Sequence, residues 1–333
     1  MTRGSEAESA RRGVPPVTSG ARRVTLLTDD GVPIDAAYTP GAGPADGPAI
    51  VVAHGFTGAL ERPVLRRAAA GLGPDAAVVT FSFRGHGRSG GRSTVGDREV
   101  RDLAAAVRWA REMGHRRVVT VGFSMGGSVV LRQAALCNGA RRTPEGTVEI
   151  QPDGPRPSAE HREHGTGRAE HSARRTGRES RGTRNLQTAP GCGPALPAGL
   201  RDDAHPDAVV AVSAPARWYY RGTAPMRRLH WVVTRPTGRL VSRYGLRTRI
   251  ARDDWDPVPL SPVASVPMIA PAPLLIVHGD QDPYFPLDHP RMLAEAGDPS
   301  STELWIERGM GHAENAATPE LLGRIAAWAT AHT

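Results

Sequence analysis

Two parts of the chain, residues 22–138 and 206–331, alternate between short apolar segments and amphipathic ones. The apolar segments have hydrophobic residues at consecutive positions, as in strands that are buried on both faces of a parallel sheet. These segments lie at 49–55, 76–87, 116–124, 206–216, 272–280 and 301–309. The amphipathic segments have apolar residues at helical spacing and lie at 61–71, 97–114, 125–139 and 319–332. Strands that alternate with helices predict a mostly parallel α/β sheet with right-handed crossovers.

Other segments depart from this alternation. Residues 22–41 hold two apolar runs around Asp30-Gly31, which is typical of a β-hairpin. Residues 217–268 are rich in aromatic residues and arginine, with helix-compatible pieces and no clear strand. The N-terminal tail, 1–21, and an insert, 139–205, are polar or rich in Gly and Pro. We expect both to be disordered, because they bury too little apolar surface to offset their conformational entropy. Histidines of the insert are interpreted as solvated rather than metal-binding: His161, His164 and His171.

The composition excludes several classes of chemistry. The 333 residues carry a net charge of +8, but all 42 basic residues are arginine and lysine is absent. We interpret the charge as a compositional bias and expect no nucleic-acid partner; Schiff-base and pyridoxal-type catalysis is excluded, since it needs a lysine amine. Cys137 and Cys192 form no zinc-binding spacing and cannot make a disulfide framework. With no secretory signal or membrane-spanning run in the sequence, we expect a reduced, cytoplasmic protein.

A candidate nucleophile lies in "VGFSMGG", residues 121–127, which contains the pattern G-x-S-x-G. Gly122 and Gly126 allow a sharp turn from strand to helix that exposes the serine above the carboxyl edge of the sheet. A strand pattern precedes Ser124 and a helix pattern follows it, as this turn requires. We therefore interpret Ser124 as a nucleophile; the alternative is a small residue in a tight turn.

Acyl transfer also needs N–H donors for the oxyanion. The N–H of Met125 follows the serine at a helix N-terminus, where the helix dipole favours negative charge. The second candidate is the N–H of Phe56 in "AHGFTGA", residues 53–59, directly after an early strand. His54 and Gly55 are expected to shape this loop.

The acid and the base should follow the serine along the chain. "HGDQDPYFP", residues 278–286, offers Asp280 and Asp282, and we prefer Asp282 because it lies further into the loop. "GMGHAE", residues 309–314, places His312 in a glycine-rich loop after the last strand. Such a histidine can take the serine proton while the carboxylate stabilises the imidazolium. Three other histidines are interpreted as structural: His86, His278 and His289.

Five segments occur in a characteristic order: "HGFTG", "SFRGHGRSGG", "GFSMGG", "HGDQDPYFP" and "GMGHAE". Through them the chain resembles the α/β-hydrolase superfamily, nearest to its serine aminopeptidase-like and esterase-like members, over residues 22–138 and 206–331. The resemblance implies an eight-stranded, mostly parallel sheet flanked by helices, with 217–268 as a small helical cap. It implies a triad and two oxyanion donors at Ser124, Asp282 and His312 and at Phe56 and Met125. It also implies a structural role for Arg84 and His86 in the "RGHG" loop. The 139–205 insert departs from the superfamily, which usually has a short connection there; gating, partner binding and an inert insertion all stay open.

The functional expectation is a serine hydrolase that needs no cofactor or metal and forms an acyl-enzyme on Ser124, from carboxylic esters with small or medium acyl groups. One alternative is an aminopeptidase or amidase, favoured if Asp253 or Asp254 of the cap holds a substrate amine. Another is a ligand-binding protein without turnover, and a weaker one is a nucleic-acid-associated protein that acts through the insert. Dehalogenase chemistry is disfavoured, because the elbow carries serine rather than aspartate. Cap arginines are interpreted as a solvated face rather than a site for an anionic substrate group: Arg217, Arg221, Arg227, Arg228, Arg235 and Arg239. The oligomeric state does not follow from the sequence.

Overall fold

The computed structural model describes residues 22–43, 47–139 and 202–333, and the account below concerns these residues. The expectation of disorder for the 1–21 tail lies outside them, as does that for nearly all of the 139–205 insert. These two expectations therefore stay predictions.

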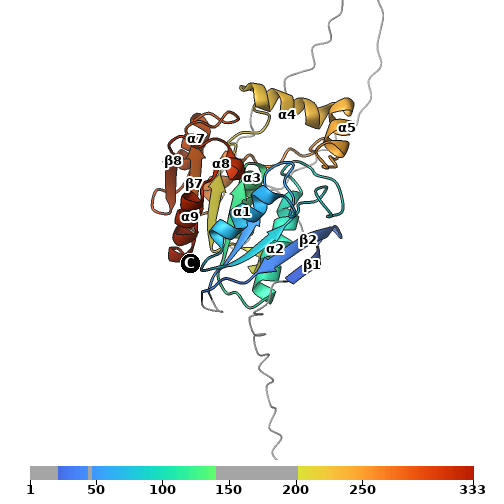
Figure 1. The fold of residues 1–333 in the computed structure, drawn as a ribbon. Helices are drawn as coiled ribbons and strands as arrows, with labels where there is room; N and C mark the ends of the chain where they lie inside the picture. Colours follow the sequence, from blue (N-terminus) through green and yellow to red (C-terminus); the bar gives the residue numbers. More distant parts are fainter. Residues whose placement is uncertain (1–21, 44–46, 140–201) are drawn as a thin grey trace, which may run out of the picture. The chain divides into compact units, whose positions relative to one another are not determined.

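The described residues contain one sheet of eight strands in the order β1-β2-β4-β3-β5-β6-β7-β8 (Figure 1). The strands are β1 (Arg22–Leu27), β2 (Pro33–Thr39), β3 (Ala49–Ala53), β4 (Ala77–Phe81), β5 (Val118–Phe123), β6 (Ala208–Val212), β7 (Leu274–Gly279) and β8 (Thr302–Glu307). β1 and β2 form the predicted hairpin, β2 pairs antiparallel with β4, and every later neighbour is parallel. The prediction of an eight-stranded, mostly parallel sheet is confirmed.

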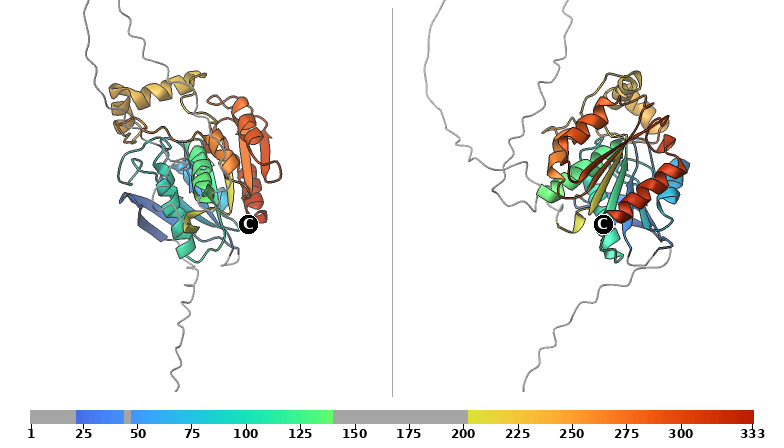
Figure 2. Two further views of the ribbon diagram at one scale, coloured as in Figure 1. Left: turned by 180° about the vertical axis from the view of Figure 1, so that it is seen from behind. Right: turned by 90° about the vertical axis from the view of Figure 1, so that its left-hand side faces the viewer.

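Successive residues of each central strand face opposite sides of the sheet, which explains why these strands are apolar at every position. In β3, Ile50 and Val52 pack in one hydrophobic cluster, whereas Val51 and Ala53 pack in another. The first cluster is covered by α1 (Pro63–Leu72), α8 (Ala313–Ala316) and α9 (Pro319–Ala331). The second is covered by α2 (Glu99–Glu112), α3 (Met125–Gly139) and α7 (Asp288–Ala296). The right-hand view of Figure 2 shows these helices as two layers on either side of the sheet.

The sequence analysis did not predict α7. This helix is nine residues long and has Pro290 in its first turn, so it offers only about two turns of apolar periodicity. Its main anchor is Leu293, which is fully buried in the same cluster as α2 and α3. The cost of nucleating such a short helix is met by tertiary packing rather than by local sequence.

The segment 217–268 is mostly helical where it has regular structure, as expected. It contains α4 (Ala224–Thr234), α5 (Pro236–Tyr244), α6 (Pro262–Ser265) and a 3₁₀ turn at Val266–Met268; a further 3₁₀ turn at Asp202–Ala204 precedes β6. Isolated β-bridges join it to the loop after β4, between His86 and Thr248 and between Ser93 and Ile250. α4 and α5 lie beyond the carboxyl ends of the parallel strands, at the top of Figure 1.

Within the described ranges, no helix combines the length and the hydropathy that are needed to cross a bilayer.

Candidate active site

Ser124 lies in the turn between β5 and α3, with a left-handed φ of 51°. Close packing imposes this turn, since a Cβ on Gly126 would overlap the carbonyl of Ala53 and a Cβ on Gly122 would overlap that of Gly126. The N–H of Ser124 donates to the Val212 carbonyl of β6 at 2.9 Å, which fixes the strained residue. Ser124 is partly exposed although both of its neighbours in the chain are buried.

The structure brings the three predicted side chains together. The Nε2 atom of His312 lies 2.9 Å from Ser124 Oγ, and its Nδ1 lies 2.7 Å from Oδ2 of Asp282. The side chain of Asp282 is fully buried and that of His312 is 14% exposed. A neutral His312 that carries its proton on Nδ1 donates to the carboxylate and leaves Nε2 to accept from the serine hydroxyl.

The Asp282 carboxylate is fully engaged. Its Oδ1 accepts the backbone N–H groups of Tyr284 at 2.8 Å and Phe285 at 3.2 Å, while Oδ2 accepts from His312. Burial raises the pKa of Asp282, but the hydrogen bond and charge of His312 and the Tyr284 N–H outweigh it, so that the pKa lies below its ordinary value. Asp282 is therefore ionised near neutral pH.

Asp280, the other candidate acid, has a different place. Its Oδ1 accepts the N–H of Gly309 at 2.6 Å, at the start of the loop that carries His312. The geometry thus places Asp282 against the histidine and Asp280 against the backbone of the neighbouring loop.

Aromatic rings enclose His312. Tyr284 stacks on the imidazole with ring centroids 4.3 Å apart, and the ring of Phe285 meets it edge-on at 5.6 Å. The next residue, Ala313, has φ 52° and donates its N–H to Ser213 Oγ at 3.0 Å. These contacts hold the ring facing Ser124. Neither aromatic residue is singled out by the sequence, although they lie two and three positions after the candidate acid in "DPYF".

His54 fixes the orientation of the peptide group that carries the Phe56 N–H. Its Nε2 accepts the N–H of Phe83 at 3.0 Å, so Nδ1 carries the proton and donates to the Gly55 carbonyl at 2.7 Å. That carbonyl and the Phe56 N–H belong to one planar trans peptide, so the N–H points the opposite way. Burial, with a smaller electrostatic contribution from the neighbouring His86, lowers the pKa of His54 to about 3 and keeps the ring neutral.

Glu314 holds the other side of the same glycine. Its Oε1 accepts the N–H of Gly55 at 3.0 Å, and its side chain is buried. A Cβ on Gly55 would lie 3.1 and 3.3 Å from the Glu314 carboxylate oxygens and 3.4 Å from the Cβ of Ser124, which shows how close these groups are. The sequence analysis gave Glu314 no role, because a carboxylate after the histidine is indistinguishable from a surface residue until its burial is known.

Two backbone donors lie beside the serine. Among the described residues, no acceptor is hydrogen-bonded to the N–H of Phe56 or to that of Met125, the first residue of α3. Both donors are therefore available to an oxygen of a bound molecule, as the oxyanion prediction requires.

Among the other candidate residues, His278 borders this group, with its Nε2 3.7 Å from Oδ2 of Asp282. The Nδ1 of His86, the Nε2 of His278 and the Nδ1 of His289 bond to backbone groups, and all three rings are buried. Asp253 and Asp254 are exposed. Over the described ranges, no group of three or more His, Cys, Asp or Glu side chains has the arrangement of a metal site.

The "RGHG" loop is anchored by a buried ion-pair network. Arg84 donates to Asp102 through Nη2 at 2.7 Å and to Asp30 through Nη1 at 2.7 Å, and the side chains of Arg84 and Asp102 are 3% and 0% exposed. The network ties the loop after β4 to α2 and to the β1–β2 hairpin, which agrees with the expected structural role.

Comparison with known proteins places the chain in a family. Residues 50–322 match the model of the alpha/beta hydrolase family. The chain belongs to the α/β-hydrolase family. No curated protein sequence matches the chain.

Solved structures share this α/β-hydrolase fold. The esterase Pf2001 of Pyrococcus furiosus aligns with a TM-score of 0.55 and 17% identity, over 94% of this chain and 91% of its own. The hydrolase GrgF of Penicillium sp. sh18 aligns with a TM-score of 0.57 and 16% identity, over 94% and 99%. XC6422 of Xanthomonas campestris, described as a serine hydrolase without a lid, aligns with a TM-score of 0.50 and 16% identity, over 96% of this chain and 95% of its own. At these identities the likeness concerns the fold.

Proposed function

We propose that this α/β-hydrolase is a serine hydrolase that forms an acyl-enzyme on Ser124. The observation that carries the proposal is the chain of hydrogen bonds from Ser124 Oγ through His312 to Asp282, at 2.9 and 2.7 Å. The buried Asp282 carboxylate orients His312, the proposed base, and Ser124, the proposed nucleophile, lies on a strained, partly exposed turn. Geometry of this kind supports nucleophilic acyl transfer.

In the acylation step, Ser124 Oγ attacks the acyl carbon of the substrate while Nε2 of His312 takes its proton. The negative charge on the former carbonyl oxygen is stabilised by the N–H groups of Phe56 and Met125. Asp282 stabilises the imidazolium that forms. When the tetrahedral intermediate collapses, His312 returns the proton to the leaving group, and the acyl group stays on Ser124.

In the deacylation step, water replaces the serine hydroxyl as the attacking group. His312 removes a proton from that water, the same two N–H groups stabilise the oxyanion, and Ser124 leaves with the proton from Nε2. The acid product and the free enzyme result.

We propose carboxylic esters with small or medium acyl groups as the substrates. An alcohol leaving group needs less help from the general acid than an amine does, and the exposed Asp253 and Asp254 form no visible site for a substrate amine. The esterase named among the structural relatives is consistent with this class.

A substrate panel tests the proposal. We expect hydrolysis of p-nitrophenyl esters from acetate to octanoate and much slower hydrolysis of aminoacyl p-nitroanilides. Ser124→Ala should lower kcat/KM by about a thousandfold or more, because the acyl-enzyme cannot form. Ser128→Ala, a change of the same size in the helix that follows Ser124, serves as the matched control. Preference for the anilides would indicate an amidase, and a folded wild type with no activity on either set would favour a ligand-binding protein.

A further inference from the structure

The cap differs in charge from the rest of the chain. The cap, residues 217–268, contains ten arginines against three acidic residues, Asp253, Asp254 and Asp256, whereas the whole chain has 42 arginines against 34 acidic residues. Within the described parts of the chain, the ion pair of a cap arginine with a carboxylate is the one between Arg217 and Asp288, at 2.8 Å. Other cap arginines bond to neutral carbonyl oxygens, as Arg227 does to Gly222. Arginines of the core, by contrast, pair repeatedly with Asp or Glu. Most of the positive charge of the cap is therefore uncompensated.

Helix α5 has its apolar face on the outside. Its buried residues are Gly238 and Ser242, and a Cβ on Gly238 would overlap the backbone of α4. Leu240, Val241 and Tyr244 lie at helical spacing on the opposite face and are 57%, 49% and 73% exposed. A helix of a soluble domain normally buries such a stripe, so this face indicates a partner.

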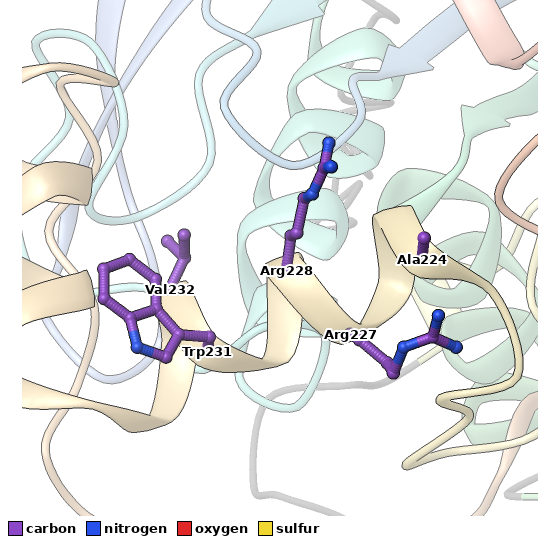
Figure 3. Close-up of a pocket in the computed structure, with 5 residues that line it drawn as sticks. All are labelled: Ala224, Arg227, Arg228, Trp231 and Val232. Carbon is purple, nitrogen blue, oxygen red and sulfur yellow. The ribbon is translucent and has the colours of Figure 1, made fainter.

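Helix α4 adds positive charge and an indole to the same two-helix unit. Arg227, Arg228 and Trp231 are exposed on α4, and Trp231 is 46% exposed. Together with Ala224 and Val232 they line a shallow surface depression of about 560 Å³. Figure 3 shows Arg227 and Arg228 extending to either side of the helix and the Trp231 ring beside Val232.

We propose that exposed side chains of α4 and α5 bind the surface of an anionic phospholipid bilayer. We call these side chains the cap surface: Arg227, Arg228, Trp231, Leu240, Val241 and Tyr244. Basic residues with protruding aromatic and aliphatic side chains, and no acidic ones, are what an interfacial helix needs. The arginines meet lipid phosphates, while the apolar side chains enter the boundary between headgroups and acyl chains.

Two other occupants fit the charges less well. A second copy that docks through the same face would oppose one set of uncompensated arginines to another. Residues 140–201 of this chain contain eleven arginines and seven acidic residues, so that segment has the same sign of charge as the cap. An anionic bilayer supplies the opposite charge together with an apolar phase.

Binding of the cap surface to a bilayer would bring the candidate active site close to the lipid headgroups. α4 and α5 lie beyond the carboxyl ends of the strands, where Ser124 is (Figure 1). At the start of α4, Thr223 Oγ1 donates to the Tyr284 carbonyl at 2.9 Å, and Tyr284 stacks on His312. Contacts through Thr223 and Tyr284 thus link the start of α4 to His312. The proposed binding to a bilayer does not depend on catalysis.

Vesicle sedimentation with the full-length protein tests the proposal. We expect binding to phosphatidylcholine vesicles that contain a third phosphatidylglycerol, weak binding to pure phosphatidylcholine, and weakening by salt. Arg227→Ser/Arg228→Ser should lower the affinity roughly 30-fold, because each arginine near an anionic bilayer contributes about a fivefold factor. Leu240→Ser/Tyr244→Ser should lower it by about tenfold or more.

Matched variants remove similar residues elsewhere: Arg66→Ser/Arg308→Ser for exposed arginines and Leu27→Ser for an exposed leucine. These should bind like the wild type, and so should Ser124→Ala, which separates this proposal from the hydrolase proposal. Addition of vesicles should also shift the tryptophan emission to the blue, and Trp231→Phe should remove that shift. Circular dichroism checks that each variant is folded. Equal binding to both vesicle types, no binding, or a dimer that Leu240→Ser/Tyr244→Ser dissociates would overturn the proposal.

Discussion

At the scale of single residues, the environment of Gly55 decides how the site is organised. One buried side chain, His54, donates to its carbonyl, and another, Glu314, accepts its N–H. The two peptide groups on either side of Gly55 are therefore both held, and the second of them carries the Phe56 N–H. An oxyanion donor works because it is positioned before the reaction, and here the positioning depends on residues that never touch the substrate.

Glu314→Ala should accordingly lower kcat by about tenfold to a hundredfold on a p-nitrophenyl ester, with little change in KM. The loss arises because the Gly55 N–H loses its acceptor and the Phe56 N–H is no longer held in place. Glu314→Gln keeps an amide oxygen as an acceptor and should restore most of the rate. Steady-state kinetics checks both variants. If Glu314→Ala raised KM instead and left kcat unchanged, Glu314 would act in substrate binding and not in positioning.

At the scale of elements, the β5–α3 turn depends on backbone contacts that only glycine permits. The backbone of α3 passes so close to β3 that Gly126 contacts Ala53 without room for a side chain. The same close approach brings the helix N-terminus, with its unpaired donors, to the serine.

Gly126→Ala should therefore destabilise the fold by about 1–3 kcal/mol or more and reduce the activity of the molecules that remain folded. Gly323→Ala is the matched control, because Gly323 is exposed on α9 and a Cβ there would meet no atom within 4 Å. It should raise the free energy of unfolding by about 0.5–1 kcal/mol, since alanine favours the helix. Urea unfolding of both variants measures the difference. A neutral Gly126→Ala would show that α3 can move away from β3 at little cost.

At the scale of the whole molecule, buried neutral histidines link stability to pH. Burial lowers the pKa of His54 to about 3 and that of His289 to about 4, and it also lowers the pKa values of His86 and His278. The unfolded chain takes up these protons at a pKa near 6.5, while the folded protein does not. A histidine whose pKa is lower in the folded protein than in the unfolded chain therefore reduces the free energy of unfolding as the pH falls below 6.5. For His54 this reduction continues down to about pH 3.

The free energy of unfolding should thus decrease from pH 7.5 to pH 5. Each such histidine contributes up to about 1.4 kcal/mol per pH unit below 6.5. Urea titrations across this range measure the slope. His289→Gln keeps an acceptor for the Ala216 N–H. It should reduce the dependence of the free energy of unfolding on pH by the contribution of one histidine. A stability that does not change between pH 7.5 and 5 would mean that the folded protein takes up these protons as readily as the unfolded chain does.

Much of the architecture could be predicted from the chain itself. Continuous apolar strands and amphipathic helices define the parallel sheet, and glycines around Ser124 indicate the turn. The preference for Asp282 over Asp280 rested on its distance from the strand, and the structure places Asp282 against His312.

What the sequence did not show depends on tertiary contacts. Glu314, Tyr284 and Phe285 reach the site through packing, and α7 is too short to give a clear period. The absence of lysine and the abundance of arginine favour a solvated face for the cap arginines, but composition does not reveal which side of a helix is buried. The exposed apolar stripe of α5 became visible only when Gly238 and Ser242 were seen to face inward.

The central claim is that Ser124 is the nucleophile, and labelling by a fluorophosphonate probe tests it most directly. The probe reacts with serines that are activated by a neighbouring base, so we expect stoichiometric labelling of the wild type. Mass spectrometry of a digest should locate the adduct on Ser124, and Ser124→Ala should not be labelled whereas Ser128→Ala should be. Labelling that persists in Ser124→Ala, or a folded wild type that does not react, would contradict the claim.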